Sequence, residues 1–210
     1  MRTRVLLDGL LIGESARWHD GRLWLANWGT GRILTVDDDG RTEVQAAVDP
    51  AVVPISIDWL PDGTLLVVAG SQARLLRQET DGSLVDHVGL ELLPGGLNEI
   101  VVDRRGVIFV NGGNEFDPDS GRASGFIASI DQSGTVRVVA EGIAFPNGMV
   151  VTSDGRTLII AESFAARLTA FDIDGSSLIN RRTWAAVPAD GISIDAADGI
   201  WTPTMIGNDP

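Results

Sequence analysis

Cysteine is missing from all 210 residues of the sequence. A chain without cysteine has no disulfide framework, no thiolate nucleophile and no thiolate ligand for a metal ion. Lysine is missing as well, and the 29 acidic residues outnumber the 16 arginines, which gives a net charge of −13 and a pI near 4.4. This balance opposes binding to nucleic acid, because phosphate backbones are held by clustered basic side chains.

Long apolar runs are also absent. A membrane helix needs roughly 20 consecutive apolar residues, and no stretch of the sequence approaches that length. Asp8 and Gly9 interrupt the first apolar run too early for the core of a signal peptide. We therefore expect a soluble, cytoplasmic protein that binds neither nucleic acid nor membranes.

Common catalytic motifs are missing too. The sequence has no G-x-S-x-G motif and no P-loop, which argues against a Ser–His triad and against phosphate binding of the P-loop type. Its two histidines, His19 and His87, fall at an expected turn and in an expected outer strand. We expect both to be solvated rather than catalytic.

A repeat is present instead. Turns built on glycine recur at intervals of 42, 43, 49 and 44 residues, and a second series recurs in step at 42, 52 and 41 residues. A period of roughly 40–50 residues, with about four strands in each unit, is typical of a β-propeller. The first series consists of Gly21, Gly63, Gly106, Gly155 and Gly199, and the second of Gly40, Gly82, Gly134 and Gly175.

The repeat predicts an all-β fold. It runs without a linker, so we expect one propeller domain over residues 1–210, with about four complete blades and the start of a fifth. No segment of ten or more residues shows the 3.6-residue apolar periodicity of a helix. The tryptophans follow strand periodicity and are predicted to lie in the blade cores; they include Trp18, Trp24, Trp28, Trp59 and Trp201.

The third unit carries an insertion, NGGNEFDPDSG, over residues 111–121. An insertion in one unit of a repeat is often a binding loop. A surface loop rich in glycine and aspartate, without a function of its own, fits the same residues equally well.

Polar residues stand at equivalent places near the start of the first strand of each unit. Counted back seven to nine residues from the first-series glycines, these places hold Glu14, Ser56, Asn98, Asn147 and Asp190. If the first strand of each unit is innermost, these side chains converge on the propeller axis. A cluster of carboxylate and amide oxygens suits a hard divalent cation such as Ca²⁺, Mg²⁺ or Mn²⁺.

A second interpretation of these residues needs no ligand. Asn and Asp are common at strand ends because they form turns, and Asn147-Gly148 taken alone resembles a hairpin turn. The counts also differ by up to two residues, and a slip of one residue moves a side chain to the other face of a strand. Both interpretations stay open at this point.

Four motifs resemble, in order, those of the SMP-30/gluconolactonase/LRE-like family. They are GESARWHDGRLW at residues 13–24, LNEIVVD at 97–103, FPNGMVV at 145–151 and ADGISID at 189–195. The resemblance covers essentially the whole chain. It implies a six-bladed propeller with one divalent cation on its axis, Ca²⁺ in the first place or Mg²⁺, Mn²⁺ or Zn²⁺, and activity toward lactones.

The resemblance also implies roles for individual residues. Glu14, Asn147 and Asp190 match the family's metal ligands, and Asn98 matches a residue that contacts the substrate. Glu115 lies near a substrate-contacting acid of the family. Gly96, two residues before Asn98, stands where the sugar-lactone enzymes carry an arginine, so the resemblance does not extend to an aldonolactone substrate.

The leading hypothesis is a metal-dependent hydrolase of small lactones, with Asp190 as general base and the cation polarising the carbonyl group. The alternative is a non-catalytic truncated propeller, either a pseudoenzyme or a binding module. A strictosidine-synthase-like enzyme is a weaker option, because that chemistry needs no axial metal. The period also leaves about one and a half blades of a six-bladed ring outside the chain. It therefore predicts a C-terminally short chain that self-associates through exposed strand edges.

Overall fold

The computed structural model describes residues 4–203. These residues form strands and three short 3-10 turns, η1 (Pro50–Val52), η2 (Gly70–Gln72) and η3 (Ser163–Ala165). Within this range, no helix has the length and apolar character to cross a membrane. The prediction of an all-β chain is confirmed.

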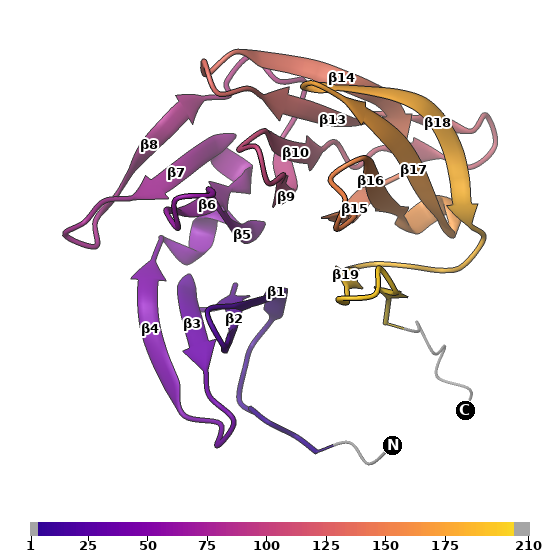
Figure 1. Ribbon diagram of the computed structural model, residues 1–210. Coiled ribbons are helices and arrows are strands. Elements are labelled where there is room, and N and C mark those ends of the chain that lie inside the picture. Colours follow the sequence, from indigo (N-terminus) through magenta and orange to yellow (C-terminus); the bar gives the residue numbers. More distant parts are fainter. Residues whose placement is uncertain (1–3, 204–210) are drawn as a thin grey trace.

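Four antiparallel sheets of four strands follow one another along the chain and stand around a common centre (Figure 1). A two-stranded ribbon follows the fourth sheet. In each sheet the first strand in sequence faces the centre and the last lies at the periphery (Figure 1). This is the blade arrangement of a propeller, and it agrees with the predicted four blades and the start of a fifth.

The first sheet contains β1 (Gly13–His19), β2 (Arg22–Asn27), β3 (Arg32–Val36) and β4 (Thr42–Ala47). The second contains β5 (Ile55–Trp59), β6 (Leu65–Ala69), β7 (Arg74–Gln78) and β8 (Leu84–Gly89). The third contains β9 (Leu97–Val102), β10 (Ile108–Gly112), β13 (Gly125–Ile130) and β14 (Val136–Ile143), and its insertion forms the hairpin β11 (Phe116–Asp117) and β12 (Arg122–Ala123). The fourth contains β15 (Pro146–Val151), β16 (Thr157–Glu162), β17 (Arg167–Asp174) and β18 (Ser177–Ala185), and the ribbon is β19 (Ser193–Ile194) with β20 (Ile200–Trp201).

The apolar core lies between adjacent sheets. Strand β6 shows why: Val67 packs in the cluster shared with the first sheet, whereas Leu66 and Val68 pack in the cluster shared with the third. Successive side chains of a strand point to opposite faces, so a strand between two sheets is apolar on both. All five residues of β6 are accordingly buried.

The prediction for the tryptophans is partly wrong. Trp24, Trp28 and Trp59 pack against the core between the first two sheets, as expected. Trp18 and Trp201 are instead 68% and 60% exposed. They belong to the first sheet and to the ribbon, each of which has a neighbouring sheet on one side only within residues 4–203.

Each innermost strand pairs with one neighbour, so its other edge has no ladder partner. Side chains of adjacent sheets bond to the free backbone groups of these edges. The Ser15 hydroxyl accepts from the Ile57 N–H (2.9 Å), the Asp58 carboxylate accepts from the Val102 N–H (2.7 Å), and the Asn98 amide donates to the Pro146 carbonyl (3.0 Å). Polar residues near the axis therefore join one blade to the next.

A buried carboxylate joins the third and fourth sheets away from the axis. Glu162 is 0% exposed and accepts hydrogen bonds from the Ala144 N–H (2.9 Å) and from Arg167 and Arg181 (3.0 and 3.1 Å). Burial by itself raises the pKa of Glu162, but the bonds from Arg167, Ala144 and Thr169 outweigh burial and lower the pKa below its ordinary value.

We expect Glu162→Gln to lower the free energy of unfolding by on the order of 3 kcal/mol, because the Ala144 N–H and two partly exposed arginines lose a buried, ionised acceptor. The matched control is Asp172→Asn, which breaks the exposed pair with Arg182 and is expected to cost less than about 1 kcal/mol. Because the folded pKa of Glu162 is lowered, its stabilisation is present at neutral pH and is lost as the pH falls through that pKa. Urea denaturation at several pH values measures both effects, and equal losses for the two variants would contradict the expectation.

Candidate metal and substrate site

Three innermost strands carry an irregularity at the places where site residues were predicted. Strand β1 has one extra residue between Glu14 and Arg17, opposite β2, and β15 has one between Pro146 and Met149, opposite β16. The register of β9 against β10 shifts in the same way between Leu97 and Ile100. Such bulges re-aim side chains and are common beside functional sites.

Asn147 and Asp190 are in direct contact. The Asn147 side-chain amide donates to one carboxylate oxygen of Asp190, and the Gly148 N–H donates to the Asp190 carbonyl (3.1 Å). A Cβ atom at Gly148 would lie 2.3 Å from the Ile192 backbone nitrogen, so only glycine permits this approach. The structure therefore brings two of the three predicted ligands together, with the carbonyl oxygen of the Asn147 side chain left as an acceptor.

Glu14 lies near the same place, on β1. Its side chain is half-buried. Burial raises the pKa of Glu14, and the neighbouring charges of Asp190 and Glu99 raise it further. Negative charge thus gathers at this point of the axis, and a bound cation would relieve it.

Asn98 and Asn111 hold the third and fourth sheets together beside this pair. The Asn98 amide N–H group donates to the Pro146 carbonyl, which leaves its own carbonyl oxygen as an acceptor. Asn111 is fully buried; its amide donates to the Asn147 carbonyl (2.7 Å) and its oxygen accepts from the Glu99 N–H (3.3 Å). Asn111 thereby positions the backbone of a candidate ligand.

Two cavities flank these residues. One, of about 390 Å³, is lined by Asn98, Gly96 and the exposed Glu115, together with Phe145. The other, of about 380 Å³, is lined by Glu14, Ser15, Arg17 and Glu99. Asn98 and Glu115, both predicted to contact substrate, therefore share a cavity that the metal-ligand candidate Glu14 does not line.

The repeat also predicted that Ser56 lies with the other polar residues near the axis. It is 2% exposed on β5, and its hydroxyl has no hydrogen-bond partner among the described residues. Strand β5 pairs with β6 without a register shift. The structure shows no contact that joins Ser56 to Glu14, Asn147 or Asp190.

The sequence interpretation missed Glu99, Arg17 and Asn111 as members of this region. Glu99 and Arg17 form an ion pair (3.3 Å) and line the same cavity as Glu14. Glu99 immediately follows Asn98, and in a regular strand adjacent residues face opposite sides. The bulge in β9 breaks that rule, and a bulge leaves no reliable mark in a single sequence. Asn111 was seen only as the first residue of the insertion.

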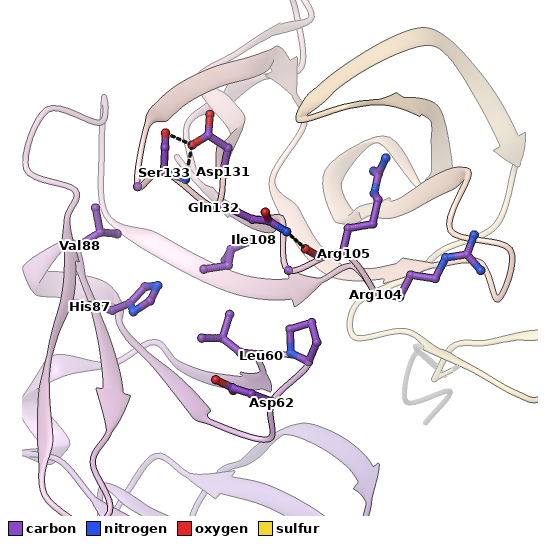
Figure 2. A pocket seen from close by; sticks show the side chains of 13 residues that line it. Leu60, Asp62, His87, Val88, Arg104, Arg105, Ile108, Asp131, Gln132 and Ser133 are labelled. Atoms are coloured by element: carbon purple, nitrogen blue, oxygen red, sulfur yellow. Dashed lines mark hydrogen bonds between the residues drawn. The ribbon is translucent and has the colours of Figure 1, made fainter.

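A further cavity, of about 560 Å³, lies between the second and third sheets (Figure 2). Leu60, His87 and Ile108 face it, with Asp131 and Gln132 at one side. Burial, followed by the charge of Arg77, lowers the pKa of His87, which favours the neutral ring. None of the predicted site residues lines this cavity.

The donor chemistry of the candidate site fits a divalent cation. Among residues 4–203, no three acidic, histidine or cysteine side chains converge to hold a metal ion on their own. The candidate set therefore depends on the amide oxygen of Asn147 beside the carboxylates of Glu14 and Asp190. All three are hard oxygen ligands of the kind that Ca²⁺ and Mg²⁺ prefer.

Comparison with known families agrees with this geometry. The family model described as the SMP-30/gluconolactonase/LRE-like region matches residues 12–209. The chain belongs to this family. The SMP-30/gluconolactonase/LRE-like match includes all four motifs that carried the resemblance in the sequence.

Individual relatives are consistent with that membership. The pentonolactonase XacC of Haloferax volcanii is 25% identical over 216 residues, which cover 98% of this chain and 70% of the relative. A gluconolactonase from Xanthomonas campestris has a similar fold, with a TM-score of 0.79 at 20% identity, covering 95% of this chain and 72% of that one. Regucalcin from Agrobacterium tumefaciens, described as a calcium-binding protein, has a TM-score of 0.68 at 22% identity. The match covers 92% of this chain and 67% of regucalcin.

We expect Asn111→Ala to lower the free energy of unfolding by about 2–3 kcal/mol, because the Glu99 N–H and the Asn147 carbonyl lose a buried partner. Chemical denaturation measures this loss. Asn114→Ala, at an exposed position three residues later, is the control and should stay within about 0.5 kcal/mol of the original chain. Similar stabilities for the two variants would show that Asn111 does not hold these strands.

Proposed function

We propose that this protein hydrolyses small lactones with the help of one divalent cation, Ca²⁺ in the first place, held by Glu14, Asn147 and Asp190. The observation that supports the proposal most directly is the contact between Asn147 and Asp190 beside the half-buried Glu14. Family membership and the relatives that are lactonases point to the same class of reaction. Mg²⁺, Mn²⁺ and Zn²⁺ are the other candidate cations.

When bound, the cation would polarise the lactone carbonyl group. Asp190 accepts a proton from the attacking water, and the Asn147 amide orients its carboxylate through a hydrogen bond. Water oxygen bonds to the carbonyl carbon, the ring C–O bond breaks, and the departing ring oxygen takes the proton back from Asp190. The product is the open-chain hydroxy acid, and Asp190 returns to its ionised form.

The neighbouring cavity would hold the body of the substrate. Asn98 offers its side-chain carbonyl oxygen to a substrate hydroxyl, because its amide N–H group is engaged with Pro146. Glu115 lines the same cavity from the insertion and is exposed. Pro54, Leu97, Phe145 and Pro146 give the cavity an apolar side, and no arginine among residues 4–203 lines it. These residues suit an uncharged lactone.

We expect lactone hydrolysis to disappear on treatment with EDTA and to return on addition of CaCl2. Asp190→Ala should lower kcat/KM by on the order of 10²–10⁴-fold, because both a proton acceptor and a ligand are lost. Asp86→Asn, in the exposed pair with Arg74 on β8, is the control and should retain activity. The assay is turnover of a panel of five- and six-membered lactones.

Two results would contradict the proposal. Turnover that survives complete chelation would exclude a role for the cation, and full activity of Asp190→Ala would exclude Asp190. A folded protein that hydrolyses no lactone would favour the non-catalytic alternative, which shares the propeller fold.

A further inference from the structure

Arg17 reaches across the propeller centre from β1 to β9. One guanidinium nitrogen, Nη2, lies 3.3 Å from Glu99 Oε1 and donates to the Ile100 carbonyl at 3.1 Å. The side chain of Arg17 is 17% exposed and that of Glu99 is 9% exposed. Arg17 of the first sheet therefore pairs with Glu99 of the third sheet, whose carboxylate is nearly buried.

Glu99 is held in this position by two further donors. The Ser15 hydroxyl donates to Oε1 at 3.2 Å, and the Ile100 N–H donates to the same oxygen at 3.1 Å. Ser15 in turn accepts from the Ile57 N–H. Arg17 Nη2, the Ser15 hydroxyl and the Ile100 N–H all contact Oε1 of Glu99, so this carboxylate oxygen is tied to β1 and to its own strand.

The charges around Arg17 are predominantly negative. Glu14, on the side of the candidate metal site, lines the same cavity as Glu99. Asp58 lies on the other side, where its carboxylate accepts from the Val102 and Trp59 N–H groups at 2.7 and 2.9 Å. In the described part of the chain, Arg17 is the basic residue whose charge acts on both Glu99 and Asp58.

Arg17 also stands between two cavities. It lines the cavity of about 380 Å³ that contains Glu14 and Glu99. It lines a second cavity, of about 440 Å³, with Asp58 and Met149 on the opposite side. Arg17 therefore lies between one cavity that contains Glu14 and Glu99 and another that contains Asp58.

The groups that Arg17 satisfies are those that a hard cation would bind. A carboxylate oxygen and a backbone carbonyl oxygen are typical ligands of Ca²⁺. A buried carboxylate also needs a nearby positive charge, whether it comes from a side chain or from a metal ion. Resting on the proposed function, we infer that Arg17 is a built-in counter-cation at the propeller centre, which neutralises Glu99 and thereby limits this region to one divalent cation.

The test replaces the guanidinium by an uncharged side chain of similar length, in Arg17→Met. Calorimetric titration with CaCl2 is expected to show one more bound Ca²⁺ per chain than in the original protein. In EDTA the melting temperature should fall by on the order of 10 °C, because the carboxylates lose their counter-charge. Added CaCl2 should restore it, since binding to the folded state alone stabilises that state.

Two control variants separate charge from packing. Arg17→Lys keeps a positive charge at the propeller centre and should bind the same number of Ca²⁺ ions as the original chain. The double variant Arg17→Met/Glu99→Gln removes the charge that attracts the extra ion and should return to the original number.

An unchanged Ca²⁺ stoichiometry in folded Arg17→Met would overturn the inference. So would failure of this variant to fold in CaCl2, because the incoming ion is expected to replace the guanidinium. This test is independent of the test of the proposed function, which measures lactone turnover by the original chain. The readout here is the difference in bound ions between variant and original protein, whether or not any lactone is hydrolysed.

Discussion

The free inner edges of the blades are the constraint on which the centre of this protein depends. Each innermost strand is bonded to one neighbour, so a row of N–H and C=O groups faces the axis without a ladder partner. Buried backbone groups without partners are costly. Here Ser15, Asp58 and Asn98 each bond to the backbone of the next blade. Polar side chains at the axis are thus required by the architecture before any ligand is considered.

The candidate site uses the same kind of contacts. Asn111 satisfies the backbone of both Glu99 and Asn147, and Gly148 allows the segment after Asp190 to approach β15 closely. Bulges in β1, β9 and β15 lie at these residues, where they turn successive side chains away from strict alternation. The residues of the candidate site therefore also hold neighbouring blades together.

The buried carboxylates differ in the positive charge that lies near them. Besides burial, Asp190 and Glu99 both raise the pKa of Glu14, and Glu99 in addition forms an ion pair with Arg17. Away from the axis, Glu162 shows the other solution, in which two arginines and an N–H group keep a fully buried carboxylate ionised. An acidic chain without lysine thus places arginine at the few points where a carboxylate is buried.

Much of this protein could be predicted from the sequence, because the relevant signals are local. The repeat of turn glycines and the lack of helical periodicity predicted an all-β propeller with four blades and the start of a fifth, and ordered motifs predicted the family. The places of Glu14, Asn98, Asn147 and Asp190 near the axis followed from the same repeat. Long-range packing decided the rest. The Arg17–Glu99 pair, the role of Asn111, the separation of Glu115 and Glu14 into two cavities and the exposure of Trp18 depend on how sheets face one another. One extra residue in a strand turns its side chains, and only the neighbouring blades determine where they then point.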